Sequence, residues 1–433
     1  MRIFLWLSAL FTVFHGCVTT NSSFTKVAPG TWRGVLELSQ YSVPVRDKDT
    51  VFILHEAYKE GELPFNFEVK YTDAEHFYVE IINGTERIRC DSILYGRDKT
   101  NARDTVNIYF PEYQSYIHVD VRGDVMQGEW VVTTKDNYRV PFYAQAGRPY
   151  RFTPLQEKPA GDLSGAWATL FGAETDSPSK AIGEFKQTGN HLEGTFRTET
   201  GDYRFLEGSV QGRKFMLSCF DGSHAFLFYG SLRNDSLFGE FRSGKTHREL
   251  FTGWRDPAFQ LGRADTLTTV RSGAETKVTF DLITPEGKRL VFPGPEFGDK
   301  IKVFTIMGTW CPNCRDEQVF MARYLKDHPD MAARMHVVGF AFERNKTPED
   351  ANAHLVQYKS KLGLPFDLVY AGKANTEAAQ KVFPELNKVM AFPTLLILDQ
   401  HNVIRYVHTG FDGPATSQYA AFAETFDKVL RSL

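Results

Sequence analysis

The sequence lacks a strong charge of either sign, because its 433 residues carry a formal net charge of only −3. Nothing in it therefore points to nucleic acid or to a polybasic membrane patch as a partner. Closely spaced metal ligands are also lacking, so we expect no metal site. The histidines of the N-terminal half stand apart from other ligand residues: His76, His118, His191 and His224.

Helical periodicity is nearly absent from about residue 28 to 260. Alternating apolar and polar residues recur there between Gly, Asn and Asp turns, as in residues 67–71 and 116–121. This pattern is typical of antiparallel strands that face a core on one side. The 36 Phe and 18 Tyr of the chain suit β-rich folding. We predict an all-β antiparallel N-terminal region.

A weak internal repeat divides this β region. Residues 124–130 resemble residues 235–241, and a Gly-rich segment with a Trp precedes each unit. We therefore predict two similar meanders, residues 28–155 and 156–260, that form either two small barrels or the halves of a larger one. Aromatic-rich meanders can enclose a ligand, although aromatic residues at strand spacing are far more often core.

The N-terminus has the pattern of a targeting segment. Arg2 precedes an apolar stretch, residues 3–14, that is too short to span a bilayer, and Cys17 follows before a polar run. This resembles a bacterial lipoprotein signal, in which the Cys becomes the acylated first residue. We predict a signal peptide over 1–16, lipidation at Cys17 and a tether over 17–27. The alternative is a secreted protein with Cys17 as a stray thiol.

Residues 309–317 read Thr-Trp-Cys-Pro-Asn-Cys-Arg-Asp-Glu and follow an apolar, β-branched run at 301–307 that predicts a buried strand. Cys311 falls where the next helix would begin. Unpaired N–H groups and the helix dipole stabilise a thiolate at such a place, and the thiolate is the form that attacks a disulfide. We predict that Cys311 attacks and that Cys314, one turn further on, resolves the mixed disulfide.

The C-terminal part, residues 276–433, resembles a thioredoxin-fold domain of the TlpA/ResA-like family. The members of this family are membrane-tethered, extracytoplasmic thiol-disulfide oxidoreductases. Residues 310–314, Trp-Cys-Pro-Asn-Cys, resemble the family's Trp-Cys-x-x-Cys motif. Glu317 matches its active-site carboxylate. Residues 392–394, Phe-Pro-Thr, match the cis-proline loop that faces the dithiol, and only X-Pro bonds adopt cis at modest cost.

The resemblance implies a multidomain chain in which a polar linker, residues 261–275, joins the β region to an α/β thioredoxin-like domain. It also implies a reductase of protein disulfides that needs no cofactor beyond its cysteine pair. A membrane thiol electron donor would re-reduce it, in the periplasmic part of the cell envelope. The implied catalytic residues are Cys311, Cys314, Glu317 and Pro393, and the implied substrate contacts are Trp310, Pro312, Phe392 and Thr394.

Secondary-structure signals follow the motif along the C-terminal part. His328-Pro329 predicts the end of the cysteine helix, and Thr347-Pro348 predicts the start of another. Further strands are predicted at 278–282, 290–292, 336–342, 366–370, 395–399 and 403–408, and further helices at 376–383 and from about 417.

Glu317 has two interpretations. Cytoplasmic thioredoxin carries a buried Asp on the strand before the motif, where this chain has Thr305, so a proton relay must come from elsewhere. Glu317, three residues after Cys314 on one helix face, is the nearest candidate. Alternatively, Glu317 sits in the first turns and favours the helix dipole.

Cys90 and Cys219 lie in strand-like surroundings and remain unassigned. They could form a disulfide, but an apolar free cysteine is often simply buried, and we favour the buried interpretation.

Three alternatives to exchange chemistry remain. Cys311 and Cys314 could form a structural disulfide. A peroxidase would need Pro at 304 and Thr at 308, where this chain has Phe304 and Gly308. The protein could instead be a lipoprotein binding module, in which the β region captures a ligand or partner and the thioredoxin-like domain serves as a docking platform.

Overall fold

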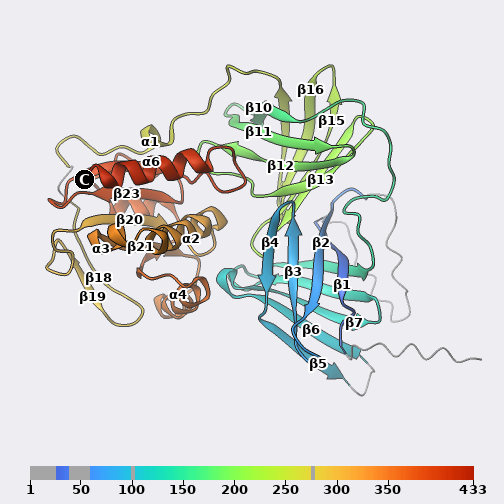
Figure 1. Ribbon diagram of the computed structural model, residues 1–433, viewed down its shortest axis with the longest axis horizontal. Coiled ribbons are helices and arrows are strands. Elements are labelled where there is room, and N and C mark those ends of the chain that lie inside the picture. The colour runs from blue at the N-terminus through green and yellow to red at the C-terminus, as the bar shows by residue number, and fades with distance from the viewer. Residues whose placement is uncertain (1–25, 39–58, 99–102, 275–277) are drawn as a thin grey trace, which may run out of the picture.

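The computed structural model describes residues 26–38, 59–98, 103–274 and 278–433. The predicted signal peptide, Cys17 and the tether up to residue 25 lie outside the described residues. Within the described residues, no helix is both long and apolar enough to cross a membrane. Two β units lie side by side, and an α/β part lies next to both of them (Figure 1).

The first β unit is a nine-stranded antiparallel sheet with the strand order β4-β3-β2-β1-β9-β8-β7-β6-β5. A single 3-10 turn, η1 (Pro111–Tyr113), interrupts it between β6 and β7. Its strands are β1 (Gly30–Glu37), β2 (Glu62–Tyr71), β3 (Phe77–Asn83), β4 (Glu86–Cys90), β5 (Ile93–Asp98), β6 (Arg103–Phe110), β7 (Ser115–Arg122), β8 (Val125–Val132) and β9 (Arg139–Ala146).

The second β unit is a closed barrel of eight strands, each paired with its neighbours in chain order. The last strand pairs back onto the first and closes it. Its strands are β10 (Gly165–Phe171), β11 (Ser179–Thr188), β12 (His191–Thr198), β13 (Leu206–Gln211), β14 (Lys214–Phe220), β15 (Ala225–Arg233), β16 (Ser236–Ser243) and β17 (His247–Trp254).

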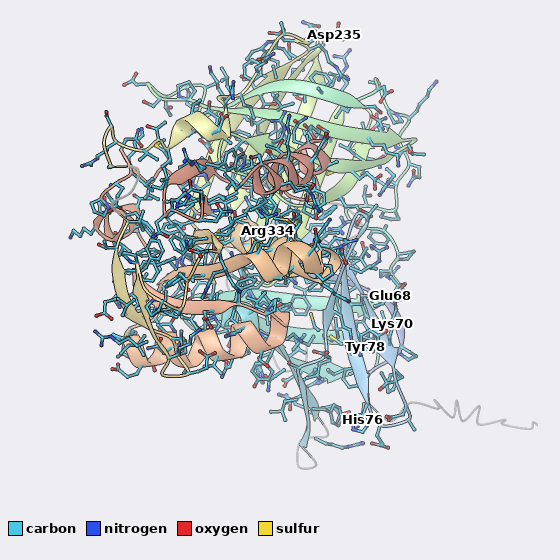
Figure 2. The ribbon with its side chains drawn as sticks, turned by 60° about the vertical axis from the view of Figure 1, so that its left-hand side comes forward. Glu68, Lys70, His76, Tyr78, Asp235 and Arg334 are labelled. Atoms are coloured by element: carbon cyan, nitrogen blue, oxygen red, sulfur yellow. A yellow bond between two sulfur atoms is a disulfide. The ribbon has the colours of Figure 1, made fainter. Side chains whose placement is uncertain are left out.

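The alternation that predicted these strands is present in β2. Phe67 and Val69 are buried, whereas Glu68 and Lys70 are half-buried and point to the other face. Figure 2 shows Glu68, Lys70 and Tyr78 together on that side, and the Lys70 Nζ lies 3.0 Å from the Glu68 carboxylate. The prediction of antiparallel strands with one core face is confirmed here.

Both β units open with the same tryptophan arrangement. The Trp32 Nε1 donates to the carbonyl of Ala28 at 2.9 Å, and the Trp167 Nε1 donates to the carbonyl of Leu163 at 2.8 Å. Each Trp lies on the first strand of its unit, which pairs with the last strand of the same unit. The repeat seen in the sequence is therefore a structural repeat.

The two units differ in closure, which neither sequence alternative foresaw. The first sheet is open, with β4 and β5 as its edges. Side chains of the barrel, among them Phe220 and Leu227, are part of the hydrophobic core of this sheet. Phe220, at the end of β14, packs 4.7 Å from the Phe65 ring and 5.1 Å from the Trp130 ring. The open sheet and the closed barrel thus share a core. Phe220 of the barrel packs on the apolar face of the sheet, which stays open at its edges.

Aromatic rings pack the interior of the barrel. The centroid of Phe171 lies 5.2 Å from that of Phe196 and 5.8 Å from that of Phe241, and all three side chains are buried. Phe228 stacks on Phe241 at 4.5 Å. These rings form a core, so the aromatic pattern of this unit reflects packing rather than an enclosed ligand site.

The C-terminal part is built on a five-stranded mixed sheet with the order β22-β21-β20-β23-β24. Strands β20, β21 and β22 run parallel, and β23 and β24 pair antiparallel beside them. The sheet strands are β20 (Ile301–Met307), β21 (Met335–Glu343), β22 (Asp367–Lys373), β23 (Thr394–Leu398) and β24 (Ile404–Thr409), preceded by the hairpin β18 (Phe280–Ile283) and β19 (Arg289–Phe292). The helices are α1 (Ala264–Leu267), α2 (Pro312–Asp327), α3 (Pro329–Arg334), α4 (Pro348–Leu362), α5 (Thr376–Val382) and α6 (Tyr419–Arg431).

The predicted strands and helices match observed elements to within about three residues, and β20 matches its prediction at both ends. The short helix α3, which starts directly after the predicted end of the cysteine helix, was not predicted. Thr347 caps α4 by accepting a hydrogen bond from the backbone N–H of Asp350 at 3.1 Å. The linker contains the short helix α1, which had no signal in the sequence.

Candidate active site

Cys311 is the N-cap of α2, as the sequence predicted. The buried strand β20 leads into a turn over residues 308–310, and Pro312 then starts the helix with a φ angle suited to its first position. The backbone N–H of Cys314 donates to the Cys311 Sγ at 3.2 Å. Such a donor stabilises a thiolate at this sulfur once the pair is reduced.

Cys311 and Cys314 form a disulfide whose Cα atoms lie 5.2 Å apart. Cys311 is 8% exposed and Cys314 is fully buried. Cys311 is thus the less buried residue of the pair. The attacking and resolving roles of the two residues stay a prediction.

The loop before β23 faces the disulfide. The peptide bond between Phe392 and Pro393 is cis, as predicted. The Cys311 Sγ lies 3.7 Å from the carbonyl oxygen of Phe392, and the Thr394 hydroxyl donates to the carbonyl of Ala391 at 2.8 Å. The structure thus brings together residues that are about 80 positions apart in the sequence.

Trp310 forms one side of the site. Its Nε1 donates to the carbonyl of Phe342 at 2.8 Å, and its ring lies 5.6 Å from the Phe392 ring in an edge contact. The guanidinium of Arg344 lies 4.1 Å from the centroid of the Trp310 ring. This cation–π contact fixes the exposed side of the indole next to Cys311.

Glu317 is fully buried beneath the cysteine pair. It lies in the second turn of α2, where no charged partner among the described residues is close to its carboxyl. Burial raises the pKa of Glu317 to about 8, and its closest polar partner is the Gln318 Nε2 at 3.5 Å. A carboxyl that is protonated near neutral pH can give or take a proton, which suits a relay.

Thr305 is buried on β20 and accepts a hydrogen bond from the Gln318 Nε2 at 3.0 Å. The position that holds an Asp in cytoplasmic thioredoxin is therefore occupied here by a neutral hydrogen-bonded group.

Glu343 is a site residue that the sequence did not single out. Its carboxylate accepts from the backbone N–H of Thr309 at 2.9 Å and from the Thr309 hydroxyl at 2.7 Å. Burial raises the pKa of Glu343 to about 7. The bonds hold the turn that precedes Cys311. One signal could have found it, because a charged residue directly follows the apolar run predicted at 336–342.

Cys90 and Cys219 are free, and both are buried. Burial raises the pKa of each thiol above its ordinary value. They do not bridge, which confirms the buried interpretation, and neither has thiolate character near neutral pH. The Cys311–Cys314 pair is therefore distinguished from the other described cysteines by both its position and its bonding.

Comparisons with known proteins give matches in solved structures alone: no family model and no curated protein matches the chain. A thiol:disulfide interchange protein of the thioredoxin family from Chlorobium tepidum is 18% identical, with 36% of this chain and 92% of that chain covered at a TM-score of 0.27. A secreted disulfide oxidoreductase from Mycobacterium tuberculosis is 15% identical, with 38% and 100% covered at 0.27. A lipoprotein thioredoxin from Streptococcus pneumoniae is 15% identical, with 36% and 99% covered at 0.27.

These similarities span little more than a third of this chain. The mixed sheet, the cysteine pair at the start of α2 and the cis-proline loop make the C-terminal part thioredoxin-like.

Proposed function

We propose that this protein is a thiol-disulfide oxidoreductase that reduces protein disulfides through Cys311 and Cys314. The observation that carries the proposal is the N-cap position of Cys311, where its sulfur accepts a hydrogen bond from the Cys314 N–H at 3.2 Å. A sulfur in this place becomes a nucleophile near neutral pH when the pair is reduced.

The reaction proceeds by two exchanges. The Cys311 thiolate attacks one sulfur of the substrate disulfide, forms a mixed disulfide and releases the other sulfur as a thiolate, which takes up a proton. The Cys314 thiolate then attacks the Cys311 sulfur and releases the second substrate sulfur as a thiol. Two electrons pass from the dithiol to the substrate, and the chain is left with the disulfide described above.

Glu317 is the group that we propose for the proton of Cys314. Both side chains are fully buried, so water does not supply a ready acceptor. The fraction of Glu317 that is ionised accepts the proton when Cys314 becomes a thiolate, and this fraction grows as the pH approaches the raised pKa of about 8.

The remaining parts of the proposal rest on the sequence. The Cys17 pattern supports a lipid anchor and an extracytoplasmic place in the cell envelope, where disulfide-bearing proteins are available. A membrane thiol donor would return the pair to the dithiol by the reverse exchange. The reducing direction comes from the family resemblance.

The test is to trap the mixed disulfide. Cys314→Ala removes the resolving sulfur, so we expect disulfide-linked adducts through Cys311 that a reducing agent releases. They should be visible by non-reducing electrophoresis of cell extracts and mapped to Cys311 by mass spectrometry. The matched control is the double variant Cys311→Ser, Cys314→Ala, which should form no adduct. Equal adduct yields from the two chains would refute the proposal.

A further inference from the structure

The barrel covers the face of the C-terminal part on which Cys311 lies. The covering segment is the loop between β12 and β13, residues 199–205, which we call the cap loop. The backbone carbonyl of Asp202 accepts from the Asn313 Nδ2 at 3.3 Å, and the Asp202 carboxylate accepts from the backbone N–H of Gly413 at 2.9 Å. The cap loop thus contacts one of the two residues between the cysteines, Asn313, and the loop after β24.

Glycines mark how closely the two surfaces approach. A Cβ at Gly201 would lie 2.0 Å from the Asn313 Nδ2, and a Cβ at Gly410 would lie 2.5 Å from the carbonyl carbon of Thr200. The N–H of Gly410 also donates to the carbonyl of Pro393 at 2.8 Å. The cap loop therefore touches the immediate support of the cis-proline loop.

A second barrel loop covers the other side. The Ser223 hydroxyl donates to the carbonyl of Trp310 at 3.1 Å. The barrel thus contacts Trp310 and Asn313, which lie within two residues of Cys311, and Gly410, which binds the cis-proline loop. Cys311 itself is only 8% exposed.

Arg204 anchors the cap loop in all three parts of the molecule. Its side chain is 2% exposed, forms an ion pair with Asp316 on α2, and lies 2.5 Å from Glu86 on β4 and 3.6 Å from Asp221 in the barrel. Asp316 is only two residues after Cys314. Arg204 offsets the charges of three largely buried carboxylates, and withdrawal of the cap loop would leave them without this cation, so these ion pairs hold the closed arrangement.

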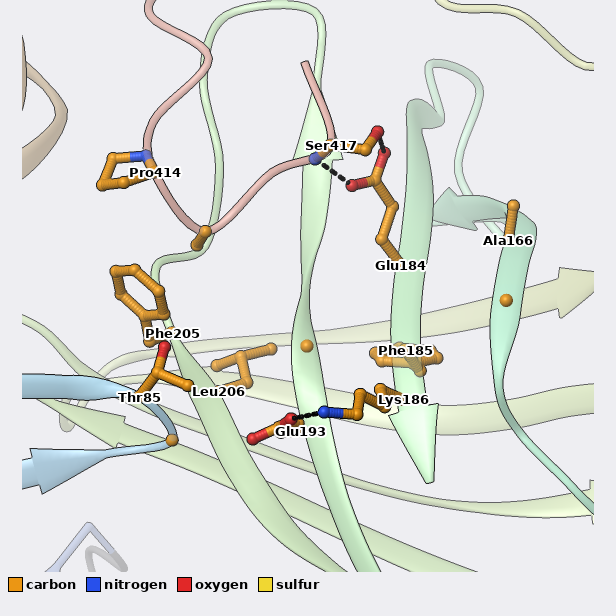
Figure 3. Close-up of a pocket in the computed structure, with 14 residues that line it drawn as sticks. Thr85, Ala166, Glu184, Phe185, Lys186, Glu193, Phe205, Leu206, Pro414 and Ser417 are labelled. Atoms are coloured by element: carbon orange, nitrogen blue, oxygen red, sulfur yellow. Dashed lines mark hydrogen bonds and ion pairs between the residues drawn. The ribbon is translucent and has the colours of Figure 1, made fainter. Parts of the chain in front are cut away.

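The loop before α6 adds a further contact. Ser417 donates to Glu184 of β11 through its backbone N–H at 2.8 Å and through its hydroxyl at 3.0 Å. Figure 3 shows this pair at the rim of a groove between the barrel and residues 414–417. The loop from Gly410 to Ser417 is thus attached to the barrel along its length.

We propose that the cap loop occupies the face through which a protein disulfide would reach Cys311, so that the chain is closed to protein substrates until this loop withdraws. This inference rests on the proposed function and adds a regulation of the same site. A folded protein substrate must contact the surface around Cys311, and Thr200, Asp202 and Ser223 now lie against that surface. The apparent affinity for such a substrate equals the intrinsic affinity multiplied by the fraction of molecules in which the cap loop has withdrawn.

The test compares a small and a large thiol reagent on the reduced full chain. In a Cys314→Ala background, Cys311 is labelled by iodoacetamide or by a maleimide carrying a polymer of about 5 kDa, and the signal of the same chain with Cys311→Ser is subtracted. Arg204→Ala removes the anchor. The matched control is Arg151→Ala, another buried Arg, which pairs with Glu207 at 2.7 Å within the β units.

We expect Arg204→Ala to raise labelling by the large reagent about tenfold or more, with a change of less than about twofold for the small one, and Arg151→Ala to leave both rates unchanged. Gly413→Ala is a second opening variant that keeps every charge, because its Cβ would lie 2.5 Å from the Asp202 Oδ2. Equal labelling by the large reagent in the parent chain and both opening variants would overturn the inference.

The same variants with Cys314 restored separate this inference from the proposed function. Insulin reduction should rise with opening, whereas reduction of oxidised glutathione should not. If no chain reduces either disulfide but large-reagent labelling still rises, the cap stands and the proposed function fails. If the wild type reduces insulin as fast as the opening variants, the function stands and the cap fails.

Discussion

At the scale of single residues, the site combines a nearly buried Cys311, a fully buried Cys314 and two buried carboxyls. The Glu343 carboxylate accepts two hydrogen bonds from Thr309, whereas the Glu317 carboxyl accepts one long hydrogen bond from the Gln318 Nε2, at 3.5 Å. A carboxyl that is hydrogen-bonded to the turn positions it, and a carboxyl left without close donors is the better proton carrier. We therefore expect the two acids to have different roles, although burial raises the pKa of both.

Glu317→Gln should alter how stability depends on pH. The pKa of Glu317 is raised from 4.5 to about 8, so between these values the folded chain holds a proton that the unfolded chain has lost. The free energy of unfolding of the wild type therefore falls as pH rises through this window. Gln does not ionise, so the stability of the variant relative to wild type should increase by about 1 to 4 kcal/mol from about pH 5 to about pH 8.

Urea unfolding of both oxidised chains across this range measures the difference. Glu343 contributes equally to the two chains and cancels. A difference in unfolding free energy that stays flat with pH would mean that Glu317 is ionised in the folded state throughout.

At the scale of elements, Phe220 at the end of β14 joins the barrel to the open sheet. Phe220→Ala should lower the free energy of unfolding by about 3 to 5 kcal/mol, because its fully buried ring fills the space between Phe65, Phe110 and Trp130. Phe238→Ala is the control, since that ring is 44% exposed and should cost less than about 1 kcal/mol. Chemical unfolding of the two variants tests this, and equal losses would show that the shared core is not what holds the units together.

The elements also show what a sequence can predict. The N-caps Cys311 and Thr347 were predictable because each helix start depends on residues within three or four positions. The closure of the barrel and the openness of the first sheet were not, since alternation gives the facing of each strand but not the pairing of the edge strands β4 and β5.

The candidate site divides in the same way. The cysteine pair, Glu317 and the cis-proline loop carry local motifs. Glu343 was missed because its role depends on the pairing of β20 with β21, which brings the ends of the two strands level. The contact of Arg204 with Asp316 joins residues 112 positions apart and leaves no periodic trace in the sequence.

At the scale of the whole molecule, two β units built on one repeat pack against the C-terminal part next to Cys311. The first β unit also contacts the C-terminal part. The Asn345 Nδ2 donates to the Gln114 Oε1 at 3.0 Å, and the Lys361 Nζ lies 2.6 Å from the Asp91 carboxylate. The N-terminal region is thus packed against the C-terminal part rather than separate from it. Under the proposed function, it covers the surface next to the attacking sulfur.

The most direct test of the central claim is the stoichiometry of exchange. The fully reduced chain is mixed with an excess of oxidised glutathione, and the glutathione released is counted while the cysteine peptides are mapped by mass. We predict that one disulfide is reduced per chain and that Cys311 and Cys314 end as a disulfide, with Cys90 and Cys219 still free. Exchange of the same extent in Cys311→Ser would contradict the account.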